Sequence, residues 1–432
     1  MLDIHRSMAS QPRSPAAPAD DGANNGDFLP ADELQEVFLR LPSKSLGRLR
    51  TICRSWRSML SDPLFVAAHA TRSRADSIFV VAVHHPGHQL VDINLVDVST
   101  GAVLRCMDGL ALATRRFCVG GELLCFVEPT PVGGAGAVQV LDPATGATTD
   151  VLQPGDATDG GTMTDVLQPG GATAPQIHTG CTASLYLVGH VPTTGEHKVL
   201  HITDVRGKQA CEVFTIGAAA GRNNIRQCQR WRPAQSPPMR VDSIPRRRAV
   251  VNGVAYFLPS HNNGCCLPDY DSVAAFDLEK EEWRPAPIRG PLSSEGPGHC
   301  DQLLRFSLAE LNGRLIMVHH NYQHKTIDMY SLSPADMGEG VQWSRALSLR
   351  LDSVLDRTNK RETMVQPLME LDDGRIVVSV LGTEHSVVRV YYPRKETRTD
   401  VMKMPKGRII VGCYKGSLLP FRVVGEAGCV CG

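Results

Sequence analysis

Two different spacings of hydrophobic residues divide this chain of 432 residues. Near the N-terminus apolar side chains recur at helical intervals, as at Leu34, Val37 and Leu41, which share one face of an amphipathic helix. From about residue 77 onward the apolar residues form short, β-branched runs separated by turn residues. The pattern predicts an α+β chain, with a small helical unit followed by a larger all-β unit.

The helical unit carries start and stop signals for three short helices. Pro30 suits a first helical turn, and Pro42 ends that helix. Ser43 is a cap for a second helix, and residues 52–60 form a third that stops at Pro63 or continues there into another turn. A unit of roughly 40 residues is too small to bury so many apolar side chains by itself. We therefore expect its exposed apolar face to bind another protein.

Three short motifs follow one another in this helical unit: LP at Leu29, RLPSKSL at residues 40–46 and ICRSW at residues 52–56. Together they resemble the F-box of plant F-box proteins. The resemblance implies a module that docks on a Skp-type adaptor, which joins it to the cullin and RING subunits of a ubiquitin ligase. The positions matching the motif are Leu29, Pro30, Leu34, Val37, Leu39, Leu41, Pro42, Leu46 and Trp56. Some of them will face the adaptor and others the core of the module. The alternative is a helical subdomain packed on the rest of the chain.

The β unit repeats a strand, a turn and a second strand at intervals of roughly 45 to 60 residues. The first strands of these units are expected at residues 77–83, 123–128, 184–191, 253–258, 314–320 and 375–381. Repeats of this length suit the blades of a propeller, so the sequence predicts an all-β propeller-like domain of about six blades. The third unit is less regular than the others. A last apolar run, at residues 408–414 with 417–423, is expected to help close the ring beside the first unit.

This region also resembles the F-box-associated propeller-like domain of plant proteins. The resemblance rests on VNGVAYFL at Val251, AFDLEKEEW at Ala275 and LAELNGRLIMV at Leu308. A large β-sandwich or two stacked β domains remain as alternatives.

These patterns predict the division of the chain into domains. Residues 1–26 are rich in Ala, Pro, Ser and Gly and are expected to be a disordered tail. The F-box spans 27–72 and the β unit spans 77–424. Within the β unit, residues 151–176 are expected to be a loop insertion or disordered, because TDVLQPG occurs twice around them and a surface loop accepts such an insertion at little entropic cost.

Charge and composition limit the classes of binding partner and the cellular compartments that the sequence favours. Lys plus Arg and Asp plus Glu both number 45, so no net charge attracts nucleic acid or an anionic membrane. No apolar run long enough for a membrane span and no secretory signal is visible, and we expect a protein of the cytoplasm, the nucleus or both. The 13 cysteines are expected to be free thiols in a reducing compartment.

The motifs of catalysis and of cofactor binding are missing from the sequence. We find no G-x-S-x-G elbow and no glycine-rich phosphate loop, so we expect no catalytic residues and no cofactor. Cys265 with Cys266 and Cys429 with Cys431 lack the C-x-x-C spacing of zinc sites. Adjacent histidines in a strand point to opposite faces, so the pair at 319 and 320 should not share an ion. No metal site is predicted.

One basic stretch, which includes Arg230, Trp231 and Arg232 and is followed by the triplet 246–248, suggests a contact surface. Our hypothesis is that this stretch and the loop around 261–271 form a rim that binds a target protein. The alternative is a solvated loop whose arginines pair with local carboxylates.

The sequence therefore predicts a non-catalytic adaptor: an F-box that docks on the ligase and a β domain that captures an unknown target protein for ubiquitination. Two other classes remain open. One is an enzyme built on a propeller, and the other is a scaffold or RNA-binding propeller that acts without the ligase.

Overall fold

The computed structural model describes residues 29–41, 43–72, 78–84, 90–98, 100–111, 117–120, 122–127, 138–143, 146–151, 183–205, 207–216, 231–260, 270–292, 305–332, 342–356, 362–371, 373–382, 385–405 and 408–414. The predicted tail at 1–26 and the predicted insertion after residue 151 lie outside these ranges.

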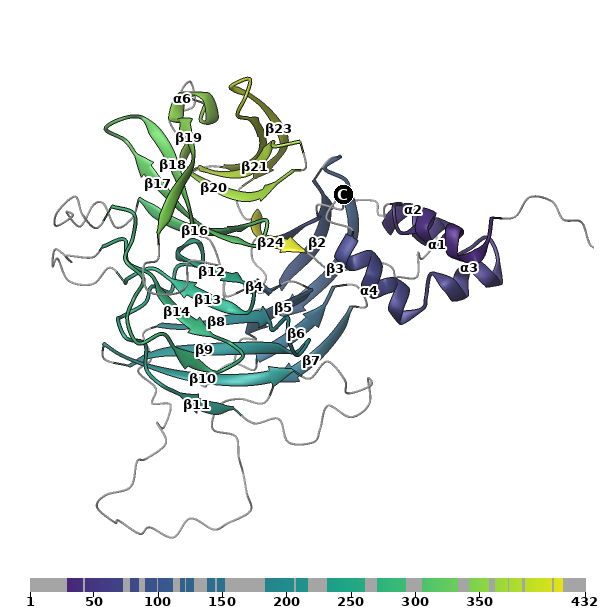
Figure 1. Ribbon diagram of the computed structural model, residues 1–432, viewed down its shortest axis with the longest axis horizontal. Helices are drawn as coiled ribbons and strands as arrows, with labels where there is room; N and C mark the ends of the chain where they lie inside the picture. The colour runs from purple at the N-terminus through teal and green to yellow at the C-terminus, as the bar shows by residue number, and fades with distance from the viewer. Residues whose placement is uncertain are drawn as a thin grey trace, which may run out of the picture.

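Four short helices form the N-terminal unit, coloured purple in Figure 1: α1 (Ala31–Phe38), α2 (Ser43–Leu49), α3 (Arg54–Met59) and α4 (Pro63–Arg72). Helix α3 begins two residues later than predicted, because the Cys53 side chain caps it by accepting a hydrogen bond from the Trp56 amide at 3.4 Å. Ile52 therefore precedes the helix.

Helix α4 is the further turn that the sequence left open after Pro63, extended to ten residues. It starts where the Leu64 amide donates to Asp62 Oδ1 at 2.7 Å, and proline is tolerated at the first helical position. Farther along, buried His69 donates from Nε2 to the Leu41 carbonyl at 2.9 Å. This bond ties α4 to the end of α1.

Within the described residues, twenty-four strands make six sheets of four. The first sheet contains β1 (Ile78–His84), β2 (Leu90–Asp97), β3 (Val103–Ala111) and β24 (Arg408–Tyr414); the second β4 (Phe117–Gly120), β5 (Leu123–Val127), β6 (Val138–Asp142) and β7 (Ala147–Val151); the third β8 (Ala183–His190), β9 (His197–Val205), β10 (Lys208–Ile216) and β11 (Arg232–Ala234). The fourth contains β12 (Arg248–Val251), β13 (Val254–Phe257), β14 (Ala274–Asp277) and β15 (Glu282–Trp283); the fifth β16 (Phe306–Leu311), β17 (Arg314–Asn321), β18 (Thr326–Leu332) and β19 (Trp343–Arg350); the sixth β20 (Glu362–Glu370), β21 (Ile376–Gly382), β22 (His385–Tyr392) and β23 (Thr397–Pro405).

The six sheets are the blades of a β-propeller, as predicted (Figure 1). Each blade presents one inner strand to the axis, namely β24, β4, β8, β12, β16 and β20. Neighbouring inner strands crowd there: a Cβ on Gly120 would lie 2.2 Å from the Val188 carbonyl oxygen, and one on Gly189 would lie 3.1 Å from Val250. Most of the hydrophobic core lies between adjacent blades, for example where Phe257 and Leu200 belong to one cluster.

The ring closes through the two ends of the β unit. Strand β24 pairs antiparallel with β1, with Ile78 opposite Tyr414 and Val83 opposite Arg408. In Figure 1 the yellow β24 lies with the blue strands of the first sheet. The predicted closing role is confirmed for residues 408–414, whereas residues 417–423 lie outside the described residues.

The irregular third repeat has a topological cause. The first strands predicted for the other units, such as β5, β13 and β17, are second strands of their blades, whereas β8 is an inner strand. The predicted first strand of the third unit is therefore the innermost strand of its blade, whereas the predicted first strands of the other units lie one strand farther from the axis.

The antiparallel order gives the propeller two distinct ends. The inner strands all begin at one end of the propeller, which we call the entry face. This face carries the short helix η1 (Pro245–Arg247), which precedes β12, and the turn at 322–325 between β17 and β18. The inner strands end at the opposite end, which we call the exit face, and there the side-chain amide of Asn252 donates to the Gly313 carbonyl of the next blade at 3.1 Å. Since Ile78 pairs with Tyr414, the chain coming from the helices enters β1 at the exit face.

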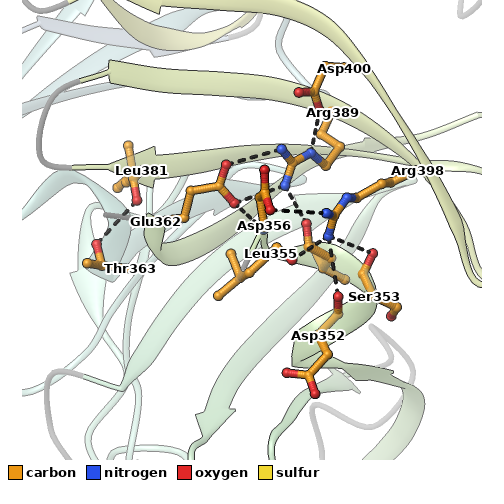
Figure 2. Close-up of polar contacts among 11 residues, drawn as sticks. Asp352, Ser353, Leu355, Asp356, Glu362, Thr363, Leu381, Arg389, Arg398 and Asp400 are labelled. Carbon is orange, nitrogen blue, oxygen red and sulfur yellow. Dashed lines mark hydrogen bonds and ion pairs between the residues drawn. The ribbon is translucent and has the colours of Figure 1, made fainter. Parts of the chain in front are cut away.

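A buried polar network fixes the connection between the fifth and sixth blades (Figure 2). Arg389 on β22 lies 3.0 Å from Glu362 on β20, and both side chains are almost fully buried. Arg389 also donates to Asp400 at 2.5 Å and to the carbonyl of Val354. Val354 ends the short helix α6 (Leu351–Val354), and Arg398 donates to the carbonyls of residues 352, 353 and 355. The network therefore anchors this crossover to the sixth blade.

Candidate functional site

The helical unit has a hydrophobic core of its own. Phe38, Leu39, Leu46, Leu60 and Phe65 form one buried cluster, drawn from every helix or its end. Trp56 packs edge-on against Phe38 with the ring centroids 5.0 Å apart. These contacts account for the fold of the unit without the rest of the chain.

Four large apolar side chains lie outside that core. Leu29 is 54% exposed, Val37 45%, Ile52 62% and Leu64 81%. The core cluster contains none of them. These four side chains are therefore available for contact with another protein.

The structure sorts the nine residues that match the F-box motif. Leu29, Pro30 and Val37 are exposed, whereas Leu39 and Leu46 are buried. The half-buried residues Leu34, Leu41 and Trp56 pack against the core cluster, and Pro42 lies outside the described residues. The first group is the most exposed of the described matching residues, and the assignment of all nine to adaptor binding stays a prediction.

Sequence reasoning missed Ile52 and Leu64 as surface residues. We had assigned Ile52 to the apolar face of the third helix, but it lies just before the Cys53 cap. Leu64 occupies the first turn of α4, directly after the capping Asp62. In both cases a capping residue next to an apolar side chain was the available signal, because helix caps lie at the surface.

Of the predicted target-binding residues, Trp231 is largely a packing residue. Its ring lies 5.5 Å from Phe214, 5.8 Å from His201 and 6.5 Å from Tyr186, measured between centroids. It thereby covers the cluster between the second and third blades. Arg230 lies outside the described residues.

Arg232 is exposed, but its charge is engaged. Its Nε donates to Glu281 of the fourth blade at 3.0 Å, and Lys198 contacts the same carboxylate at 2.9 Å. Burial opposes ionisation of Glu281, yet hydrogen bonds from both cations lower its pKa. The cluster joins two blades at the exit face.

The described ends of the two segments predicted to share a rim lie at opposite faces of the propeller. Trp231 and Arg232 stand at the start of β11 at the exit face, whereas Ser260 and Tyr270, which flank the loop 261–269, lie in the β13–β14 connection at the entry face. The error arose because the sequence does not show that the two loops follow strands of opposite direction.

The arginine triplet is not a uniformly solvated loop. Arg247 is fully buried, its Nε lies 2.8 Å from Asp242 Oδ2, and it donates to the carbonyls of Pro259 and Phe306 at 2.9 and 3.3 Å. Burial lowers the pKa of Arg247 to about 10, and it remains a cation at neutral pH. Arg247 therefore links the fourth and fifth blades.

The histidines at 319 and 320 point apart, as predicted. His319 stacks on Phe306 with the ring centroids 4.6 Å apart, whereas His320 Nε2 accepts from the Val365 amide of the next blade at 3.1 Å. Burial lowers the pKa of His319 to about 4. His319 therefore packs within the fifth blade, and His320 links the fifth blade to the sixth.

One group of potential metal ligands occurs among the described residues. Asp92, Cys106 and Asp108, on β2 and β3, bring their ligand atoms within 4.8 Å of one another. Cys106 donates to Asp108, so hydrogen bonding accounts for the group, and we assign no metal to it. The cysteines close in sequence at 265–266 and 429–431, which were not expected to bind zinc, lie outside the described ranges, and the six described cysteines are free thiols. Among the helices that the structure describes, none has the length and apolar character to span a membrane.

Comparison with protein families finds both parts of the chain. The family described as F-box domain matches residues 27–67, and the family described as F-box associated beta propeller domain matches residues 171–407, which is more than half of the chain.

Curated relatives come from Arabidopsis thaliana. A putative F-box/kelch-repeat protein is 22% identical over 367 residues, which cover 77% of this chain and 75% of the relative. A putative F-box protein is 39% identical over 261 residues, covering 60% and 59%. Among solved structures, TolB from Acinetobacter baumannii aligns over 82% of this chain and 72% of its own, with 10% identity and a TM-score of 0.39.

Proposed function

Because the chain belongs to the F-box-associated β-propeller family, we propose that it is the substrate receptor of a Skp–cullin–F-box ubiquitin ligase. The F-box would dock on a Skp-type adaptor and, through it, on the cullin and RING subunits, in the cytoplasm, the nucleus or both. One observation carries the proposal: the F-box core is complete, yet Leu29, Val37, Ile52 and Leu64 remain outside it. Apolar anchors of this kind dominate the affinity of protein interfaces.

The propeller would hold the target, and the chain itself would carry out no covalent chemistry. Its contribution is proximity, because holding a target lysine near a charged ubiquitin carrier turns a bimolecular encounter into an effectively intramolecular one. Arg230, Trp231 and Arg232 remain predicted target-binding residues, and Arg232 is the more exposed of the two that the structure describes.

Co-purification of the full chain with a Skp-type adaptor tests the docking surface. The double change Leu29→Ala with Pro30→Ala and the single change Val37→Asp should each abolish capture of the adaptor while the propeller keeps its melting temperature. Val103→Asp is the matched control, because Val103 is also an exposed apolar residue but lies on β3 of the propeller. Unaltered adaptor capture by Val37→Asp, or equal loss in Val103→Asp, would contradict the proposal.

A further inference from the structure

His190 and His197 face each other at the exit face of the third blade. Strand β8 ends at His190 and β9 begins at His197, and the two residues are directly opposite in the antiparallel pair. Just beyond them, the Val191 amide donates to the Glu196 carbonyl at 2.8 Å. Hydrogen-bonded and non-hydrogen-bonded pairs alternate along an antiparallel ladder, so the two histidines form a non-hydrogen-bonded pair. Side chains approach one another most closely in such pairs.

The separation of the two rings suits two ligands of one metal ion. Their centroids are 5.0 Å apart, and their planes are inclined by 51°. Two imidazoles that bind one tetrahedral ion through metal–nitrogen bonds of about 2.0 to 2.1 Å have their centroids about 5 Å apart. Stacking does not explain the pair, because stacked rings lie closer and nearly parallel, as Tyr186 and His201 do at 4.2 Å and 4°.

The His197 ring offers an unpaired nitrogen. Its Nε2 atom is buried and has no hydrogen-bond partner among the described residues. Buried polar atoms are nearly always paired, so this exception calls for an explanation. Burial lowers the pKa of His197 to about 4, and the neighbouring His190 contributes to the decrease, so the His197 ring is neutral at pH 7. A neutral imidazole is the form that binds a metal ion.

The surroundings of the pair allow a bound ion to keep part of its water. His190 is exposed, so an ion held by the two rings faces the solvent and avoids the full cost of burying its charge. In the part of the chain that the structure describes, no His, Cys, Asp or Glu forms a group of three ligands with these two rings. Water would therefore fill the remaining coordination positions.

The pair lies on the side of the third blade that faces the second blade. His197 is on the same face of β9 as Val199, because residues two apart in a strand share a face. Val199 belongs to a buried cluster with Cys118 of the second blade. Lys198 lies on the opposite face of β9 and contacts Glu281 of the fourth blade at 2.9 Å. The histidine pair is therefore separate from the charged cluster that joins the third and fourth blades.

We propose that His190 and His197 form a zinc-binding site at the exit face of the propeller, which joins β8 to β9 beside their connection at 191–196. Imidazole nitrogens suit zinc, copper and nickel ions, whereas magnesium and calcium prefer oxygen ligands. The bound ion stabilises the third blade, because only the folded chain holds the two rings opposite each other. The sequence predicted no metal site, since only the hairpin brings these histidines together. The inference goes beyond the proposed function and does not rest on it.

The first experiment measures zinc binding to the full chain, purified without a histidine tag, by calorimetry and by the shift in melting temperature. Zn²⁺ should raise the melting temperature of the natural protein, whereas Mg²⁺ at the same concentration should not. His190→Gln and His197→Gln each remove one of the two protein ligands and should each weaken zinc binding at least about tenfold. Equal effects of Zn²⁺ and Mg²⁺ would overturn the site.

Two variants serve as controls. His324→Gln removes an exposed histidine from the β17–β18 turn, and Cys106→Ser removes the thiol that lies near Asp92 and Asp108. Both should bind zinc as the natural protein does. If His197→Gln does not fold, His190→Gln decides the test, because His190 is exposed and its replacement leaves the core intact. Unchanged zinc affinity in His190→Gln, or an equal loss in either control, would overturn the assignment.

The second experiment identifies the ligand atoms with Co²⁺ as a spectroscopic substitute for zinc. A thiolate ligand gives cobalt a strong charge-transfer band in the near ultraviolet, whereas imidazole and water do not. The first equivalent of Co²⁺ should therefore give visible d–d bands without that charge-transfer band, and His190→Gln should lose the d–d bands. A charge-transfer band at the first equivalent would show that cysteine holds the ion and would overturn the proposal.

Discussion

Asp242 and Arg247 form a buried ion pair that organises the entry to the fourth blade. Arg247 Nε lies 2.8 Å from Asp242 Oδ2, and Asp242 Oδ1 accepts from the Ile244 amide at 2.9 Å. The same guanidinium donates to carbonyls in the fourth blade and at the start of the fifth. One pair thus fixes a loop and two blades.

Arg247→Met should lower the free energy of unfolding of the propeller by about 3 to 5 kcal/mol, because it leaves the Asp242 carboxylate buried without its partner. Guanidinium unfolding followed by tryptophan fluorescence measures the loss. The double variant Arg247→Met with Asp242→Leu should recover part of it, since both charges are then removed together.

Arg345→Met is the comparison for this prediction. Arg345 pairs with the buried carboxylate of Asp328, but the Arg345 side chain is more than half exposed, and Thr326 and Ser348 also donate hydrogen bonds to that carboxylate, so the loss should be smaller than for Arg247→Met. Similar losses for the two single variants would show that the burial of the Arg247 pair has no special effect.

Closure of the ring through β24 predicts a sharp boundary for truncation. Ending the chain after Pro405 removes the inner strand of the first blade, exposes the apolar edge of β1 and should abolish cooperative melting of the propeller. Ending it after Tyr414 keeps β24 and should leave the melting temperature unchanged. A chain ending at Pro405 that melts like the full chain would contradict closure by this strand.

The sequence predicted the larger features because each left a periodic signal. Helical spacing indicated the N-terminal unit, and β-branched runs marked a strand in every blade. Even the closing strand was found, since the apolar run 408–414 came after the sixth unit. Trp283, at the end of the motif AFDLEKEEW, shows why this motif is informative: its Nε1 donates to the Gln235 carbonyl of the preceding blade at 2.8 Å.

The sites were harder to predict, because a side chain's role depends on contacts distant in sequence. Nothing local to Trp231 shows that Tyr186 and Phe214 cover its ring. Likewise, Arg246 and Arg247 are neighbours of the same type, yet only one faces Asp242 at ion-pair distance. The inner strands β4 and β12 have four residues each, so they gave little periodicity to detect.

Buried histidines predict a loss of stability in mild acid. Burial lowers the pKa of His319 and of His197 to about 4 from 6.5, so the unfolded chain binds more protons than the folded one between these values. Stability is therefore greatest above pH 6.5 and falls as the pH drops toward 4. Between pH 7 and pH 5 each histidine should contribute a loss of about 2 kcal/mol.

Unfolding in guanidinium at pH 7 and pH 5 measures this loss. In His319→Gln the difference between the two pH values should shrink by about 2 kcal/mol, because glutamine does not titrate. His324→Gln is the control, since it removes a histidine from the exposed β17–β18 turn. An unchanged pH dependence in His319→Gln would mean that His319 is protonated as readily in the folded chain as in the unfolded one.

Trp231→Ala and Arg232→Ala should separate packing from binding at the exit face. Removing the Trp231 ring uncovers Phe214 and Tyr186 and should lower the free energy of unfolding by about 2 kcal/mol, less than for a fully buried tryptophan. Arg232→Ala removes only an exposed cation, and Lys198 still contacts Glu281, so its cost should stay below about 1 kcal/mol. Thermal and guanidinium unfolding of the two single variants give both values.

If Arg232→Ala were the more destabilising change, the charged cluster rather than the aromatic packing would hold this end of the third blade. Only a variant that keeps its stability can then be used to measure target capture, and for this stretch that variant is Arg232→Ala.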